Sequence, residues 1–455
     1  MKNLNSINSF SLQLIKSYTQ TSDHELDVAI KKTEQVFKVW GNKPLSEKLI
    51  LFKKLSQILL DQKNVLAEVA TKEMGKPLNQ AVLEVEKCAS ACDYYIENAA
   101  QILKPQTIKT DSSLSYISHE PLGCILGVMP WNFPYWQVLR FAIPTLMSGN
   151  TILLKHASNV SGCALLIEDV FKKAGFPDHI FKTLLISSDR VEGLISNPVI
   201  KGVSLTGSTE AGRKVAEAAG RYLKKLVLEL GGSDPYLILA DADLKLAAEI
   251  SMKSRLQNNG QSCIAAKRFI VLDEVYDSFK NEILLISNKT KFGDPMNSNS
   301  NLGPLARKDL KLELHAQVLS AVENGAKIAF QGDINLNDAF YPVTILENVD
   351  QSNPAYTQEF FGPVVMLFKV KSVEQAIQVA NGTSFGLGSA VFSQNVDYVL
   401  KEVVPKLESG NCFVNTMVKS DPRLPFGGIK ESGYGRELST HGMLEFTNIK
   451  TVNVS

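Results

Sequence analysis

Short apolar runs alternate with helical segments between residues 151 and 228, and this alternation limits the fold more than any other feature of the chain. The runs have the length and composition of buried strands, and the segments between them repeat apolar residues every three or four positions. We expect strands at 151–154, 183–186, 202–205 and 226–228, and helices at 160–174 and 211–219. Such alternation is typical of βαβ units, so it predicts an α/β fold with a doubly wound parallel sheet.

The flanking segments predict further structural units. Residues 23–103 have helical periodicity, whereas residues 113–118 alternate polar and apolar side chains before the apolar run 124–128, which predicts a projecting hairpin arm. A second α/β stretch extends from 234 to 412. Because 455 residues exceed the size of a single growing core, we expect two or three lobes and an active site in the cleft between them.

Composition excludes several classes of function. The net charge is +1 and the lysines are interleaved with acids, so no basic field for nucleic acid is expected. No apolar run has the length of a membrane span, and the amino-terminal residues carry no secretory or transit pattern, which predicts a cytoplasmic protein without a membrane partner. Six scattered cysteines predict reduced thiols rather than a disulfide framework. Neither they nor the six histidines have metal-ligand spacing, so no metal is expected.

One cysteine has surroundings that suggest chemistry. Cys263 follows the glycine-containing turn 260–262, and Glu229 lies a short way upstream in the segment 226–232. A thiolate attacks carbonyl carbons, but a free cysteine with a pKa of about 8.5 is only slightly ionised at neutral pH. A catalytic cysteine therefore needs an activating environment. Taken alone, Cys263 is more simply an inert cysteine beside a turn.

Five motifs in order change that interpretation, because together they resemble those of the aldehyde dehydrogenase superfamily. They lie at 130–134, 207–212, 226–232, 260–263 and 359–363, and shorter matches follow at 425–428 and 432–433. The resemblance covers essentially the whole chain. It implies a Rossmann-like cofactor domain at 1–111 and 128–232, a second α/β catalytic domain at 233–415, and a small β arm at 112–127 and 436–455 that forms a homodimer or homotetramer.

The resemblance also implies a mechanism that the residues can support. Cys263 attacks an aldehyde, and the Asn132 amide with the Cys263 backbone N–H stabilises the negative oxygen; one such donor contributes about 2.7–4 kcal/mol. Hydride transfer to the nicotinamide then leaves a thioester, and Glu229 is the candidate base for the water that cleaves it. Alone, Asn132 would be a turn residue and Glu229 a solvated acid at a strand end.

A helix start at 207–212 predicts the cofactor site, because free backbone N–H groups and the helix dipole can face a pyrophosphate. The usual GxGxxG fingerprint is absent. Serine at position 158, where the family often has a carboxylate, adds no charge to repel a 2′-phosphate, so NADP is favoured over NAD. His156 stands where the family commonly has a proline, so the resemblance does not predict the geometry of the local turn. The resemblance assigns the cofactor to Trp131, Lys155, Ser158, Gly207, Ser208, Leu230, Glu359 and Phe361.

The substrate prediction rests on Trp136, Arg140 and Ser420. In the succinate-semialdehyde branch of the family, an arginine matching Arg140 and a serine in the loop of Ser420 bind the distal carboxylate. The usual second arginine is matched by Gln257, so Arg140 as a structural ion-pair residue and a broad range of uncharged aldehydes stay as alternatives. Glu229 favours hydrolysis over acylation of CoA. A non-catalytic protein with this fold is the alternative from another class.

Overall fold

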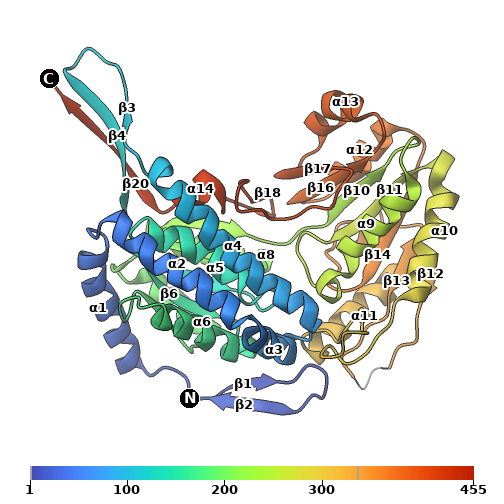
Figure 1. Cartoon of the computed structure of the whole chain (residues 1–455). Coiled ribbons are helices and arrows are strands. Elements are labelled where there is room, and N and C mark those ends of the chain that lie inside the picture. The colour runs from blue at the N-terminus through green and yellow to red at the C-terminus, as the bar shows by residue number, and fades with distance from the viewer. Residues whose placement is uncertain (1–2, 336–337) are drawn as a thin grey trace.

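Two largely parallel sheets form the frame of the molecule in the computed structural model, which describes residues 3–335 and 338–455 (Figure 1). Residues 1–2 and 336–337 of the two predicted domains therefore lie outside the described part. In the first sheet the strand order is β19-β9-β8-β5-β6-β7. Its strands are β5 (Cys124–Met129), β6 (Thr151–His156), β7 (Phe181–Thr183), β8 (Ile200–Thr206), β9 (Lys225–Glu229) and the antiparallel edge strand β19 (Gly433–Tyr434). The order reverses between β8 and β5, which confirms the predicted doubly wound topology.

Helices cover both faces of this sheet because successive strand residues alternate between two apolar cores. Ile125 and Ile152 face one core, and Leu126 and Leu153 face the other. Burying each such side chain contributes roughly 1.5–3 kcal/mol. The first core is covered by α2 (Leu45–Asp61), α3 (Lys63–Met74), α4 (Leu78–Ile102), α5 (Trp136–Met147) and α6 (Ser161–Lys173). The second is covered by α1 (Asp23–Trp40), α7 (Val191–Ser196) and α8 (Thr209–Arg221).

The second sheet has the order β12-β13-β14-β11-β10-β16-β17, and only β12 is antiparallel to its neighbour. Its strands are β10 (Asp234–Ile238), β11 (Ala266–Leu272), β12 (Lys327–Gln331), β13 (Thr344–Glu347), β14 (Val364–Val370), β16 (Gly388–Phe392) and β17 (Asn411–Val414). One face packs on α9 (Leu244–Leu256) and α10 (Asp273–Lys289), and the other on α11 (Lys308–Glu323) and α12 (Val373–Asn381). A second α/β unit is thus confirmed.

A three-stranded arm projects from the first unit and carries the carboxyl terminus (Figure 1). Its central strand β4 (Leu114–Pro121) pairs with β20 (Thr447–Val454) and with β3 (Gln106–Thr107). The predicted hairpin between residues 113–118 and 124–128 is therefore wrong. Residues 124–127, which were assigned to the arm, belong to β5 in the first sheet, because their apolar side chains are buried there between β6 and β8. The other predicted domain boundaries stay a prediction.

Most predicted elements of the first unit are confirmed with small shifts. The helical periodicity of 23–103 corresponds to α1 to α4. The strand predicted at 183–186 lies at Phe181–Thr183 instead, because Leu185 N–H turns away to the Thr21 hydroxyl. The remaining short elements include β1 (Leu4–Ile7), β2 (Leu14–Tyr18), β15 (Phe385–Gly386), β18 (Ile429–Lys430), α13 (Val396–Tyr398), α14 (Ser439–Leu444) and the 3-10 turns η1 (Ser158–Val160) and η3 (Gln257–Gly260).

Across the two described ranges, no helix is both long and apolar enough to cross a bilayer. All six cysteines are free thiols. No group of three or more His, Cys, Asp or Glu side chains among the described residues is arranged to hold a metal ion.

Candidate active site

The candidate site lies where the carboxyl ends of the first sheet meet the amino ends of the second. Asn132 follows β5, and Glu229 is the last residue of β9. From the other side, Cys263 precedes β11 and Glu359 precedes β14. Because parallel strands end at one edge of a sheet, each sheet delivers its loops to the same place. The fold thus gathers residues that are far apart in the sequence.

A left-handed turn in η3 sets the direction of the chain before Cys263. Asn258, Asn259 and Gly260 have φ values of 55°, 58° and 76°, a region that asparagine and glycine tolerate best. Asn258 Nδ2 donates to the Asn132 carbonyl at 2.6 Å, and Asn259 Nδ2 donates to the Gly75 carbonyl at 2.8 Å. These bonds fix the turn against the first unit. Cys263 therefore follows a turn that is hydrogen-bonded to the first unit.

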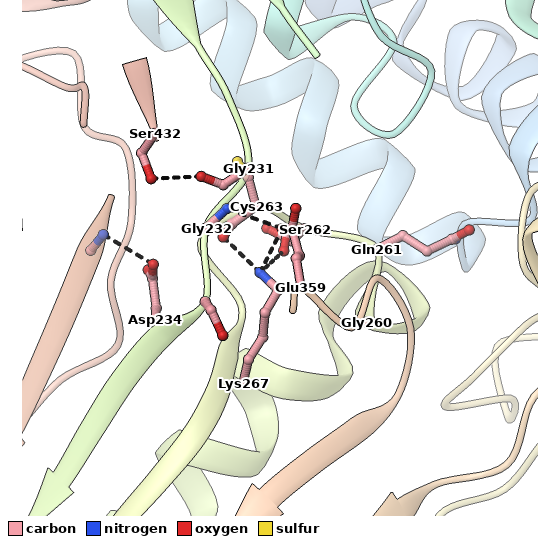
Figure 2. Close-up of polar contacts among 12 residues, drawn as sticks. Gly231, Gly232, Asp234, Gly260, Gln261, Ser262, Cys263, Lys267, Glu359 and Ser432 are labelled. Atoms are coloured by element: carbon pink, nitrogen blue, oxygen red, sulfur yellow. Dashed lines mark hydrogen bonds and ion pairs between the residues drawn. The ribbon is translucent and has the colours of Figure 1, made fainter. Parts of the chain in front are cut away.

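Lys267 connects the cysteine turn with Glu359, as Figure 2 shows. Its Nζ donates to the Cys263 carbonyl at 2.7 Å and to the Ser262 carbonyl at 2.9 Å, and it forms an ion pair with Glu359 at 3.1 Å. Glu359 also accepts from the Gly232 N–H at 3.2 Å. This network ties the loop after β9 to the loops that precede β11 and β14.

The Cys263 thiol is protonated at neutral pH in this environment. Burial raises its pKa to about 12, while the positive charges of Arg140 and Lys267 oppose that shift. A thiol is a much weaker nucleophile than a thiolate. A role of Cys263 as nucleophile would therefore require a group that removes the thiol proton.

Asn132 lies beside the cysteine turn and is almost fully buried. One of its side-chain N–H groups donates to the Gln261 carbonyl at 3.1 Å. Because an amide nitrogen carries two donors, a second N–H is left for another acceptor. This is the donor that the predicted oxyanion role requires.

Glu229 is 2% exposed, and neither carboxyl oxygen has a hydrogen-bond partner among the described residues. Burial, and then the negative charge of Glu437, raise its pKa well above the ordinary value, and Arg140 and Arg436 oppose this. This environment therefore favours the protonated, neutral form of the carboxyl group. Ionisation, and with it basicity, needs a change in hydration or charge at the site.

Six of the predicted cofactor residues lie at or just after the carboxyl ends of strands of the first sheet, whereas Glu359 and Phe361 precede β14 of the second. Lys155 ends in a buried position and has no ion-pair partner within residues 3–335 and 338–455, and burial lowers its pKa. Trp131 and Phe361 come from different sheets and their rings meet edge to face at 5.8 Å. Two polar groups that the sequence predicted to be free for a pyrophosphate, in Gly207 and Ser208, already have hydrogen-bond partners. The Gly207 N–H donates to the Glu229 carbonyl, and the Ser208 hydroxyl caps α8.

The contacts of the His156 ring define the geometry of the turn after β6, which the sequence did not predict. Burial lowers its pKa to about 4, so the ring is neutral. Nε2 donates to the Pro134 carbonyl at 2.9 Å, and Nδ1 accepts from the Ala157 N–H at 2.9 Å. The ring thus ties the end of β6 to the loop that carries Asn132. Ser158 follows in η1 and is half-buried.

A cavity of about 170 Å³ opens beside the cysteine. Its wall includes Lys87, Trp136, Arg140, Gln257, Cys263 and Ser420. An engineered cavity of about 150 Å³ holds benzene, so this one suits a small aldehyde. The three predicted substrate residues are therefore brought together with the cysteine.

Arg140 has a different environment from the one we expected. Its Nε forms an ion pair with Glu437, its Nη2 donates to Thr206 at 3.4 Å, and the guanidinium lies 5.0 Å from the Phe426 ring centroid. It is 2% exposed. The role of Arg140 as carboxylate anchor stays a prediction. The ion pair with Glu437 favours the alternative, in which Arg140 has a structural role.

Several site residues were missed in the sequence. Asn258 and Asn259 carried a local signal, since two asparagines before a glycine favour left-handed backbone. Lys87 and Glu437 carried none, because their partners lie hundreds of residues away.

A doubly wound sheet that faces a second α/β sheet with a cysteine between them defines a class of covalent, nucleotide-dependent oxidoreductases. The chain belongs to the aldehyde dehydrogenase family, whose family model matches residues 1–452. It is 44% identical to a probable succinate-semialdehyde dehydrogenase (NADP+) of Synechocystis sp., over 98% of both chains. It is 42% identical to succinate-semialdehyde dehydrogenase (NADP+) 1 of Mycobacterium tuberculosis, again over 98% of both. The solved succinic semialdehyde dehydrogenase of Streptococcus pyogenes with NADP+ superposes with a TM-score of 0.97, at 38% identity over 99% of both chains.

Proposed function

We propose that this protein oxidises succinate semialdehyde to succinate with NADP+, through a thioester on Cys263. One observation carries the proposal, namely a small cavity that joins the candidate nucleophile to a polar, cationic wall. The wall suits a short aldehyde with a carboxylate at its far end. The relatives named succinate-semialdehyde dehydrogenase support the same substrate.

The cofactor proposal rests on Lys155 and Ser158. The buried Lys155 ammonium lacks an ion-pair partner in the described ranges and fits an oxygen-rich ribose or phosphate. Ser158 presents no charge that would repel a 2′-phosphate. Trp131, Gly207, Ser208, Leu230, Glu359 and Phe361 complete the proposed contacts. When bound, NADP+ accepts hydride from the reacting carbon; NAD is the weaker alternative.

The chain's own residues perform the acyl transfer. The Cys263 thiolate adds to the aldehyde carbon, and the free Asn132 N–H with the Cys263 backbone N–H receives the oxygen that gains negative charge. After loss of hydride, the acyl group remains on sulfur as a thioester. Water then attacks this carbonyl carbon, the C–S bond breaks, and the thiol and a carboxylate are released.

Glu229 takes the proton from that water in the proposed mechanism. Its buried position beside Glu437 favours the neutral acid, so the base forms only after the site changes on acylation. Because Glu229 can activate water for deacylation, we expect the thioester to be hydrolysed rather than transferred to CoA.

A second candidate is the oxidation of uncharged aldehydes. It is favoured by the ion pair of Arg140 with Glu437 and by Gln257 in place of a second cation. A non-catalytic role is disfavoured, since Cys263, Asn132 and Glu229 all lie at one junction.

The deciding experiment measures kcat/KM of the purified protein for succinate semialdehyde and pentanal, each with NADP+ and NAD+. We expect the semialdehyde with NADP+ to be preferred by at least tenfold. A preference for pentanal would overturn the substrate, and turnover of neither would overturn the enzyme assignment.

The proposal extends to self-association and location. The arm leaves β20 as a sheet edge with exposed Ile449 and Val454, and a partner subunit would cover this edge in a homodimer or homotetramer. A reducing cytoplasm suits a chain whose six thiols are free.

A further inference from the structure

We propose that Lys87, together with Ser420, is the anchor that holds the distal carboxylate of the substrate. This inference deepens the proposed function and rests on it. It assigns the specificity-determining charge to a lysine of α4.

Lys87 points at the cavity from α4 and lies over Trp136. Its Nζ is 4.1 Å from the Trp136 ring centroid and 2.8 Å from Ser420 Oγ, and its side chain is half-buried. Trp136 Nε1 donates to the same oxygen at 2.9 Å. Lysine, tryptophan and serine thus form one polar corner of the cavity.

The Lys87 ammonium has no carboxylate within ion-pair distance in the described part of the chain, and the nearby acids have other partners. Glu84 pairs with Lys76 and accepts the N–H groups of residues 135 and 136. Asp421 pairs with Arg423 at 2.7 Å. A partly buried cation without a counter-ion favours an anionic ligand.

The Ser420 hydroxyl adds the matching donor. Its oxygen accepts from both Lys87 and Trp136, so its own proton remains free to donate. A carboxylate can accept from the Ser420 O–H with one oxygen and from Lys87 with the other. Arg140, by contrast, already has Glu437 as its counter-ion. Lys419 also borders the cavity but is exposed to solvent, so Lys87 is the half-buried cation of this wall that has no counter-ion among the described residues.

The titration of Lys87 supports this arrangement. Burial, and then the charge of Arg140, lower its pKa to about 8, while Cys88, Glu84 and Asp421 oppose the shift. Glu84 and Arg140 are held in ion pairs, the pKa of Asp421 is lowered to about 2, and burial keeps the Cys88 pKa well above its ordinary value. Lys87 is thus the member of this group that changes charge between pH 7 and 9.

The test compares Lys87→Met with the wild-type enzyme on succinate semialdehyde and pentanal. Methionine keeps the length and the packing on Trp136 but removes the charge. We expect kcat/KM for the semialdehyde to fall roughly tenfold to a hundredfold, mainly through KM, and kcat/KM for pentanal to change about threefold at most. Lys87→Arg should restore most of the loss. Lys54→Met, at an exposed position of α2 away from the cavity, is the matched charge control and should change the selectivity little.

A pH profile gives a readout that a structural role would not move. The ratio of kcat/KM for the semialdehyde to that for pentanal should fall as the pH rises through about 8, because Lys87 loses its charge; thiol ionisation cancels in the ratio. Lys87→Met should abolish this dependence. If the wild type prefers the semialdehyde but Lys87→Met leaves the ratio unchanged, Lys87 is not the anchor and the proposed function stands. If the wild type prefers pentanal, the proposed function itself is wrong.

Discussion

At the scale of single residues, the buried Glu229 carboxyl group has to ionise before it can take a proton from water. We expect Glu229→Gln to preserve the first burst of NADPH and to lower the steady-state rate by a hundredfold or more, because acylation precedes the step that needs the base. Stopped-flow absorbance separates the two phases. An unchanged steady-state rate would exclude Glu229 from deacylation.

The same substitution has a predicted effect on stability. The pKa of Glu229 is raised in the folded state, so its contribution to stability is present at low pH and is lost as the pH rises above the unfolded value of about 4.3. Glutamine is neutral in both states. The unfolding midpoint of Glu229→Gln at pH 7 should therefore equal or exceed that of the wild type, which distinguishes lost catalysis from misfolding.

We propose that Ser158 is the residue at which charge decides between NADP+ and NAD+. A carboxylate in its place would repel a 2′-phosphate and accept from ribose hydroxyls. We expect Ser158→Glu to lower the NADP+/NAD+ ratio of kcat/KM at least tenfold. Ser158→Ala adds no charge and is the control, which should keep NADP+ preferred. A constant ratio in Ser158→Glu would mean that another residue discriminates.

At the scale of elements, η3 is the turn whose geometry positions Cys263, the proposed nucleophile. A Cβ at Gly260 would lie 2.4 Å from the Gly362 carbonyl carbon, and the φ of 76° is strained for any other residue. Because Gly362 belongs to the loop of Glu359, a shift there disturbs both sides of the site.

We therefore expect Gly260→Ala to lower the unfolding free energy by about 1–3 kcal/mol or more and to reduce kcat at least tenfold. Denaturant unfolding and steady-state kinetics measure the two effects. Gly220→Ala is the matched control, since its Cβ meets nothing within 4 Å on the exposed side of α8. Equal behaviour of the two variants would show that the turn tolerates a side chain.

At the scale of the whole molecule, the arm is the feature that suggests self-association, because its edge strand β20 exposes apolar side chains. Ile449 on β20 is 64% exposed at the edge of the arm. We expect Ile449→Lys to shift the mass measured by light scattering toward the monomer, because a lysine on a sheet edge opposes strand pairing. Val39→Lys, a change at an exposed position of α1, should leave the mass unchanged. A wild-type monomer would overturn the proposed role of the arm.

The sequence by itself determined the α/β class, the order of most elements of the first unit and the identity of Cys263, Glu229 and Asn132 as candidates. These depend on local periodicity and on motifs within a few residues, which the chain carries in every conformation. The environments of Glu229 and Asn132 depend on the fold. Burial raises the pKa of Glu229, and the hydrogen bond to the Gln261 carbonyl leaves one N–H of Asn132 free.

Only the tertiary structure decided which strand pairs with β4 in the arm, and which half-buried cation borders the cavity without a counter-ion among the described residues. β20 pairs with β4 across more than 300 residues, and Lys87 meets Ser420 across 333. Glu437 takes Arg140 as its partner across a similar distance. Neither periodicity nor a short motif records such contacts, because they arise when packing of two distant segments excludes water from the charges between them.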